Sequence, residues 1–200
     1  MRVSDHRYDQ DRRKHNLAMW MISQGARTRT VTEWTGLSRY RVQKLARRYA
    51  GARPEDHRRR GISPFHPGYF GRSRSLEAES LAFALMAAEM DVLPHEVLPE
   101  ARRTLPELDR GERLRRAYEW HRAIVPEAKI SLEHAILFLI ELGQGIHWVL
   151  RRCMTCPDMM VVARVGTSRD QCPFCRQAHR KRRSTGDVPS ISADRGAQRR

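Results

Sequence analysis

Apolar residues recur every three or four positions along most of the first 150 residues, which is the pattern of amphipathic helices. A β-branched, apolar run at 159–165 instead favours a short strand. The sequence therefore predicts a mainly α fold with a small strand-containing C-terminal region. The predicted helices cover residues 15–24, 30–35, 38–49, 76–90, 111–124 and 131–142.

A glycine-containing turn, Thr35-Gly36-Leu37-Ser38, joins the second and third predicted helices. Its last residue, Ser38, is a favourable helix N-cap. One face of the following helix is apolar and expected to pack, and it consists of Val42, Leu45, Ala46 and Tyr49. Two helices joined by such a turn, the second with a basic exposed face, are typical of a helix-turn-helix, whose second helix enters the DNA major groove.

The side chains on the rest of that third helix suit DNA contact. Arginine can pair with guanine and glutamine with adenine, while further cations suit phosphates. The residues expected to read bases are Arg39, Tyr40, Arg41, Gln43 and Lys44, and those expected to bind phosphates are Arg47 and Arg48. The alternative is a basic surface helix that binds nothing.

Charge is distributed unevenly along the chain. The sequence has 38 Lys plus Arg against 23 Asp plus Glu, a net charge of +15, with a pI near 10.8. Residues 1–60 contribute +10, residues 61–150 contribute −3 and residues 151–200 contribute +8. Two basic ends around a nearly neutral middle predict two nucleic-acid contact regions joined by a core or partner-binding segment. The alternative is that the excess arginine only aids solubility.

The four cysteines form two C-x2-C pairs, Cys153 with Cys156 and Cys172 with Cys175. This spacing is typical of a four-thiolate zinc site. Four thiolates fill a tetrahedral shell, so one structural Zn²⁺ without hydrolytic chemistry is expected in a zinc-ribbon-like region. Iron and disulfides are the alternatives to zinc.

Beyond the last cysteine, four consecutive basic residues predict a phosphate-binding arm, with a solubilising tail as the alternative. They are Arg180, Lys181, Arg182 and Arg183. The expected organisation comprises a helix-turn-helix-like region at 1–60, a helical core and partner-binding region at 61–150, a metal region at 151–183 and a disordered tail at 184–200.

Two predicted helices of the middle region have apolar residues on nearly every face, over residues 81–88 and 135–142. Each is expected to be central core, with an interface as the alternative.

The longest unbroken apolar run, residues 81–88, is too short to cross a bilayer, and no signal-peptide pattern opens the chain. A cytoplasmic protein with no membrane association is therefore expected. The nine histidines are scattered and no catalytic constellation emerges, so no enzymatic activity is expected.

Several short fragments occur in an order that resembles the family of the flagellar transcriptional activator FlhC. They are Leu17-Ala18-Met19, Gly25-Ala26-Arg27, Leu37-Ser38-Arg39 through Lys44-Leu45, Gly61 with Pro64-Phe65 and Tyr69-Phe70, Ala117-Tyr118, the two C-x2-C pairs, and Lys181-Arg182-Arg183. The resemblance spans about residues 15–183.

This resemblance implies a bacterial activator that binds double-stranded DNA upstream of flagellar operons. It also implies a hetero-oligomer with an FlhD-type subunit, recruitment of RNA polymerase, and zinc held by the four cysteines. The rival interpretation is a zinc-ribbon protein that binds ribosomal or transfer RNA. Since a major-groove helix cannot enter the deep, narrow groove of A-form RNA, the rival predicts no reading helix.

Overall fold

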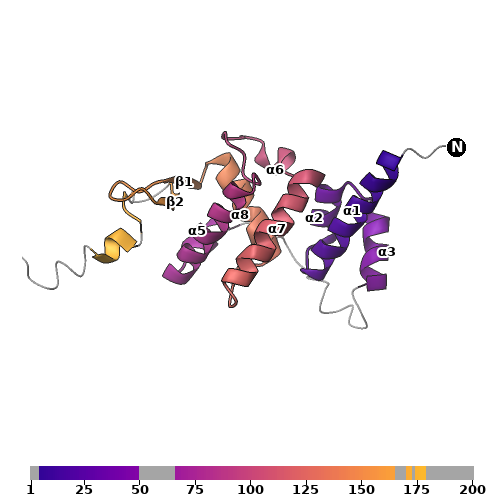
Figure 1. The fold of residues 1–200 in the computed structure, drawn as a ribbon, viewed down its shortest axis with the longest axis horizontal. Coiled ribbons are helices and arrows are strands. Elements are labelled where there is room, and N and C mark those ends of the chain that lie inside the picture. The colour runs from indigo at the N-terminus through magenta and orange to yellow at the C-terminus, as the bar shows by residue number, and fades with distance from the viewer. Residues whose placement is uncertain (1–4, 50–65, 165–169, 173, 179–200) are drawn as a thin grey trace, which may run out of the picture.

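The computed structural model describes residues 5–49, 66–164, 170–172 and 174–178, and it confirms a mainly helical fold (Figure 1). Three helices come first, α1 (Asp5–Ser23), α2 (Thr28–Thr35) and α3 (Arg39–Tyr49). The middle of the chain forms η1 (Pro67–Gly71), α5 (Arg74–Glu89), α6 (Ala101–Thr104), α7 (Leu108–Ile124) and α8 (Leu132–Gln144). Two strands follow, β1 (Trp148–Arg152) and β2 (Met159–Ala163).

All six helices predicted from the hydrophobic pattern are present, but α1 begins ten residues before the predicted start at position 15. Its first turns are charged and carry no apolar stripe, so periodicity gave no signal there. Contact with α7 holds this part of the helix, because Arg13 pairs with Asp109 and Glu112. The Arg13 Nε atom lies 2.8 Å from the Glu112 Oε1 atom.

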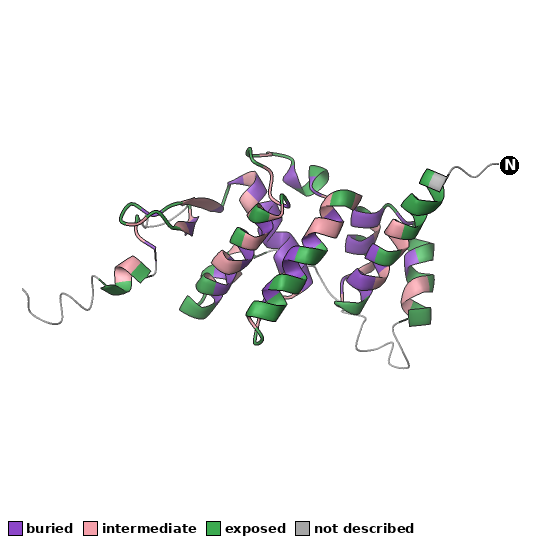
Figure 2. Cartoon of the chain, in the orientation of Figure 1, coloured by how far each residue is buried: buried purple, intermediate pink, exposed green. Residues whose placement is uncertain are grey.

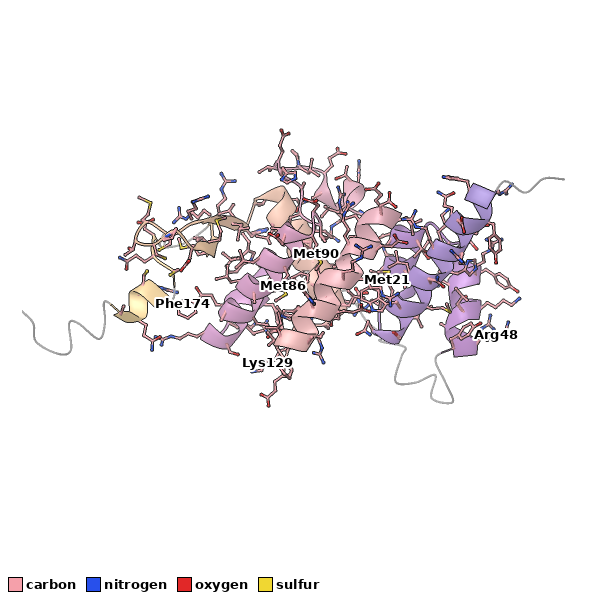
Figure 3. All side chains as sticks on the ribbon, viewed as in Figure 1. Met21, Arg48, Met86, Met90, Lys129 and Phe174 are labelled. Carbon is pink, nitrogen blue, oxygen red and sulfur yellow. The ribbon has the colours of Figure 1, made fainter. Side chains whose placement is uncertain are left out.

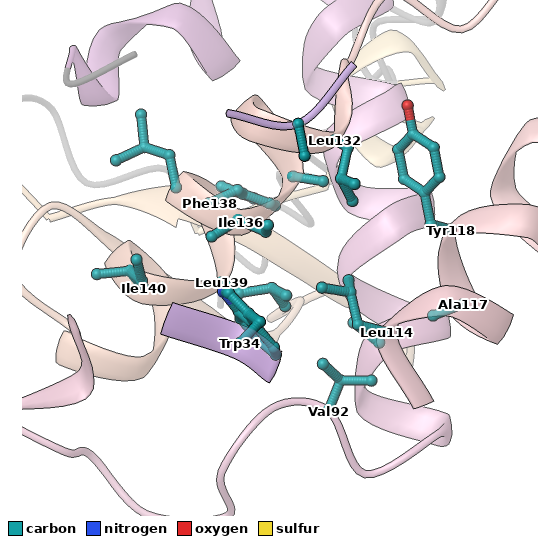
Figure 4. Packing of buried hydrophobic residues seen from close by; sticks show 14 of the residues in the cluster. Trp34, Val92, Leu114, Ala117, Tyr118, Leu132, Ile136, Phe138, Leu139 and Ile140 are labelled. Carbon is teal, nitrogen blue, oxygen red and sulfur yellow. The ribbon is translucent and has the colours of Figure 1, made fainter. Parts of the chain in front are cut away.

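Helix α8 is the centre of the hydrophobic core (Figure 4). Ser131 caps its N-terminus by accepting a hydrogen bond from the backbone N–H of His134. Its buried side chains include Phe138, which packs on Phe70 of η1 with ring centroids 4.4 Å apart. The expectation that the apolar stretch 135–142 is core is confirmed, because all but Leu142 in it are buried.

The other apolar stretch, 81–88, is core on one side only. In α5, Phe83, Ala84 and Ala87 are fully buried, whereas Leu85 is 40 % exposed and Leu81 is half-buried. Figure 2 shows that α5 has both buried and exposed residues along its length. Part of the apolar surface of α5 is therefore exposed to solvent.

The N-terminal helices do not have a core of their own. Leu17 of α1 and Trp34 of α2 belong to the same buried cluster as Leu114 of α7 and Phe138 of α8. Gly111 of α7 makes this close packing possible. A Cβ atom at position 111 would lie 2.5 Å from the Leu17 Cδ2 atom, so the Leu17 side chain would have to shift to make room for it.

Strands β1 and β2 form a two-stranded antiparallel ribbon in which Trp148 pairs with Ala163 and Arg152 with Met159. The Trp148 indole N–H donates to the Pro67 carbonyl at 2.8 Å, which fixes the start of the ribbon to η1. The ribbon thus begins before position 151, where the metal region was expected to start. Among the described residues, no helix is long and apolar enough to cross a membrane.

One buried histidine, His121 of α7, lies inside the core. Its side chain is 0 % exposed, and in the described part of the chain neither ring nitrogen has a hydrogen-bond partner. Burial lowers the pKa of His121, although the Glu79 carboxylate, 3.8 Å away, raises it and Arg122 lowers it further. The folded protein therefore favours the neutral ring.

Stability should fall with acidification because of His121. Below about pH 6.5 an unfolded histidine takes up a proton, whereas the buried ring resists protonation, so acid favours the unfolded chain. We expect the melting temperature of a His121→Gln variant to decrease less than that of the wild type between about pH 7.5 and about pH 5.5. A His6→Gln variant, altered at an exposed histidine, should follow the wild type. Parallel pH profiles for all three proteins would contradict this.

Candidate metal centre and nucleic-acid interface

The four cysteine sulfurs come together at one point of the structure. The Sγ atoms of Cys153, Cys156, Cys172 and Cys175 all lie within 4.8 Å of one another. The Cys156 and Cys172 Sγ atoms are 3.7 Å apart. A tetrahedral site with metal–sulfur distances of about 2.3 Å requires sulfur–sulfur separations of about 3.8 Å. The cluster therefore fits one structural metal ion.

Backbone hydrogen bonds bring the two pairs of cysteines close to each other. Cys153 directly follows β1, and its N–H donates to the Asp158 carbonyl at 2.8 Å, which closes the turn between the strands. The second pair is joined to this turn because the Met154 N–H donates to the Asp170 carbonyl at 2.9 Å. Backbone hydrogen bonds thus hold the turn after β1 and the segment at Asp170 together beside the cysteine sulfurs.

The second cysteine pair does not lie in the turn between the two strands, as the first pair does. Residues 174–178 are helical, so Cys175 lies on a helical turn. The strand predicted between the pairs is confirmed as β2. The Arg176 side chain, just after this pair, donates to the Glu77 carboxylate of α5 at 3.0 Å, which fixes the metal region to the helical core.

The thiols lie in unequal environments. Although burial raises the pKa of Cys153, backbone N–H groups of Cys172, Thr155 and Cys156 donate to its sulfur and together lower that pKa to about 6. The Asp158 N–H lowers the pKa of Cys156, but burial and neighbouring acidic groups outweigh it and raise the pKa overall. Backbone donors thus prepare Cys153 in particular for metal binding as a thiolate.

A small apolar cluster supports the sulfurs from one side. It consists of Met160 and Val162 of β2 together with the two buried cysteines, Cys153 and Cys172. Two apolar side chains close to the cysteines in sequence stay outside this cluster, since Met154 is 81 % exposed and Phe174, labelled in Figure 3, is 71 % exposed. So small a cluster supplies little hydrophobic stabilisation, and the metal would hold this region together.

At the other end of the chain, α2, a three-residue turn and α3 form the predicted helix-turn-helix. Gly36 has φ +68°, a left-handed conformation that few other residues adopt, and its N–H caps α2 by donating to the Thr32 carbonyl. Leu37 is buried in the turn, and the Ser38 hydroxyl accepts from the Arg41 N–H at 3.4 Å. The predicted glycine turn and the predicted Ser38 cap are therefore confirmed.

Helix α3 packs through a narrower face than predicted. Val42 is buried and Leu45 and Ala46 are half-buried, but Tyr49 is 57 % exposed, so its predicted packing is wrong. Tyr49 is the last residue of α3, and the guanidinium of Arg48 lies over its ring, 5.7 Å from the ring centroid.

The outer face of α3 carries every residue predicted there for DNA contact. All of them are exposed, and Arg48 is visible at the outer end of the helix (Figure 3). Within the described part of the chain, no carboxylate forms an ion pair with these cations. The exposed set is Arg39, Tyr40, Arg41, Gln43, Lys44, Arg47 and Arg48. The predicted arm residues Arg180, Lys181, Arg182 and Arg183 lie outside the described residues, as do residues 184–200.

The helix-turn-helix and the cysteine cluster lie at opposite ends of the molecule, with α5, α7 and α8 between them (Figure 1). A single DNA duplex that contacted both regions of one chain would have to run along its length.

Sequence reasoning missed two acidic residues at the metal centre. Asp158 lies 3.3 Å from the Cys156 Sγ atom, and Asp170 accepts a hydrogen bond from Arg151 at 3.0 Å. Their proximity to the cysteines in the sequence was the available signal for both.

No protein-family model matches the sequence, and the search of curated proteins finds no significant match.

Proposed function

We propose that the protein is a sequence-specific DNA-binding transcription regulator that reads the major groove with α3. The observation that carries the proposal is the exposed basic face of α3, held beyond a three-residue turn by α2, whose cations have no ion-pair partner among the described residues. An exposed row of cations without acidic partners carries an electrostatic cost that phosphate binding offsets. Arginine and glutamine on the same face provide hydrogen-bonding groups suited to base edges.

We also propose that the cysteine cluster holds Zn²⁺ as a structural ion. The support is the closed four-sulfur geometry, which leaves no open coordination position. Elemental analysis of the purified protein tests this directly. About one equivalent of zinc is the expected result, and one equivalent of iron would replace this part of the proposal.

In the wider proposal, the regulator activates flagellar genes in a hetero-oligomer with an FlhD-type subunit and recruits RNA polymerase. The support is the ordered resemblance of sequence fragments, together with exposed apolar side chains on the central helices that a partner can cover. These are Leu85 of α5 and Trp120 and Ile124 of α7. A purified chain that stayed monodisperse and stable without any second protein would contradict obligate pairing.

Two alanine variants of α3 should affect DNA binding in different ways. In this proposal Arg41 contacts a base, so Arg41→Ala should reduce discrimination by about 1–3 kcal/mol at one base position. Arg48, nearer the end of α3, is proposed to contact phosphate. Arg48→Ala should weaken all sequences about equally and make the salt dependence of log K shallower by about one unit.

Titrations of labelled duplexes at several salt concentrations distinguish these effects. Arg115→Ala, at an exposed arginine of α7 that pairs with Glu119, is the matched control and should leave binding unchanged. Competition with structured RNA at physiological salt tests the function itself. Duplex DNA should compete better, since α3 cannot enter the deep groove of A-form RNA. Preferential binding of structured RNA would favour the RNA-binding alternative instead.

A further inference from the structure

The outer side of α5 is apolar over about three helical turns, and no other described element covers it. The inner side packs into the core through Phe83, Ala84 and Ala87. The apolar residues of the outer side recur at helical spacing and are exposed or half-buried, and together they are named the α5 face. They are Ala78, Leu81, Ala82, Leu85 and Ala88.

Charged residues of opposite sign mark the two ends of the α5 face. Arg74 is the first residue of α5 and Glu89 is the last. Both are exposed, and neither has an ion-pair partner within the described part of the chain. They are 15 residues apart, which is about 22 Å along a helix, so they cannot pair with each other in one chain. Glu77, at the edge of the face, is already paired with Arg176 at 3.0 Å.

The α5 face is complementary to its own reversed copy. Its midpoint falls between positions 81 and 82, so position 74 corresponds to position 89, and position 78 to position 85. When two α5 helices lie antiparallel, each Arg74 is opposite Glu89 of the second copy. Each small Ala78 is opposite the large Leu85 of the second copy. An interface related by a two-fold axis requires this kind of self-complementary surface.

We propose that the α5 face is a docking surface for a second copy of this chain, with the two α5 helices antiparallel. Burial of the leucines supplies affinity, and the two Arg74–Glu89 pairs set direction and register. A parallel pair would instead place Arg74 against Arg74 and Glu89 against Glu89, which like-charge repulsion disfavours.

This inference goes beyond the proposed function and does not depend on DNA binding by α3 or on the metal. It assigns Leu85 to the second copy. On the neighbouring helix α7, which lies beside α5 in Figure 1, Trp120 and Ile124 stay exposed for a different subunit.

The size of the α5 face sets the strength of the pairing. A surface about 22 Å long and about 10 Å wide is much smaller than the roughly 800 Å² that each partner contributes to a standard interface. We therefore expect a reversible dimer that forms at micromolar concentrations.

Sedimentation equilibrium of the full chain over a micromolar concentration range measures this association. The wild type should shift from 23.3 kDa toward twice that mass as concentration rises. Leu85→Asp places a charge in the α5 face and should weaken association at least about tenfold. Its helical content should be unchanged, because Leu85 is 40 % exposed. Val97→Asp, at a 62 % exposed apolar residue outside α5, is the control and should associate as the wild type does.

Exchanging the end charges tests the antiparallel register. Arg74→Glu places a glutamate opposite Glu89 at both ends of the dimer, and Glu89→Arg places an arginine opposite Arg74. Each variant alone should associate several-fold more weakly than the wild type, although both changes suit the helix dipole. An equimolar mixture restores both opposite-charge pairs in a mixed dimer and should associate as tightly as the wild type. Arg102→Glu, at an exposed arginine of α6, is the matched control and should have no effect.

Three results would overturn the proposal. They are a wild type that stays monomeric over the whole range, a dimer that Leu85→Asp leaves unchanged, and a mixture that associates no more tightly than either charge variant alone. None of these results bears on DNA reading by α3, which the duplex titrations of Arg41→Ala test separately.

Discussion

A Cys153→Ser variant should lose the bound metal and unfold the ribbon while the helical core stays intact. Cys153 is the most strongly hydrogen-bonded of the four cysteines and is buried against Met160. A serine hydroxyl is a poor ligand for such an ion, and binding of structural zinc contributes on the order of 10–16 kcal/mol in small zinc modules. We expect the metal content to fall from about one equivalent to near zero.

Hydrogen exchange locates the effect of this substitution. Amides of β1 and β2 should exchange rapidly in Cys153→Ser, whereas amides of α8 should remain protected. Met154→Ser, at the neighbouring position with an 81 % exposed side chain, is the control and should keep its metal. A Cys153→Ser protein with a full equivalent of metal and a protected ribbon would show that the metal does not hold this region together.

Replacing Trp34 with alanine should cause the largest loss of stability in the N-terminal helices. Trp34 is 2 % exposed and lies in the shared core with Leu114 and Leu139 (Figure 4). It also packs close to Gly111 of α7. Removing a buried tryptophan costs about 3–5 kcal/mol, from lost burial and from the cavity left behind. Because Trp34 joins α2 to α7, the support for α3 is weakened at the same time.

Trp120→Ala provides the matched control for this prediction. Trp120 lies on α7 and is 56 % exposed, so the same substitution there should change the free energy of unfolding by less than about 1 kcal/mol. Urea unfolding followed by far-UV circular dichroism measures both variants. Similar losses from the two substitutions would mean that Trp34 does not link the N-terminal helices to the core.

The sequence predicted features that depend on local chemistry. The spacing of Cys153, Cys156, Cys172 and Cys175 predicted a common site, because a two-residue spacer brings each pair of sulfurs together. Gly36 likewise predicted the turn before α3, since its left-handed conformation suits glycine. These features need no information about distant parts of the chain.

The features that sequence reasoning missed depend on tertiary contacts. The first turns of α1 lack an apolar stripe and pair with α7 through Arg13. Tyr49 continues the apolar spacing of α3 but is 57 % exposed at the end of the helix, with the Arg48 guanidinium over its ring. The neutral state of His121 depends on burial by neighbouring helices. Periodicity along one helix carries none of this information.

The separation of α3 from the cysteine cluster has a consequence for DNA binding. Since the two lie at opposite ends of the molecule, the metal centre does not shape the α3 surface directly (Figure 1). If α3 reads bases as proposed, loss of metal should leave that base preference unchanged.

Selection from a pool of genomic duplex fragments tests the central claim, that α3 reads DNA sequence. The metal-loaded wild type and a variant with Arg39, Arg41 and Lys44 all changed to alanine are compared at physiological salt. The wild type should enrich a common sequence element, and the variant should lose that enrichment while keeping its helical content. Enrichment of the same element by both proteins, or by neither, would contradict the assignment of α3 as the reading helix.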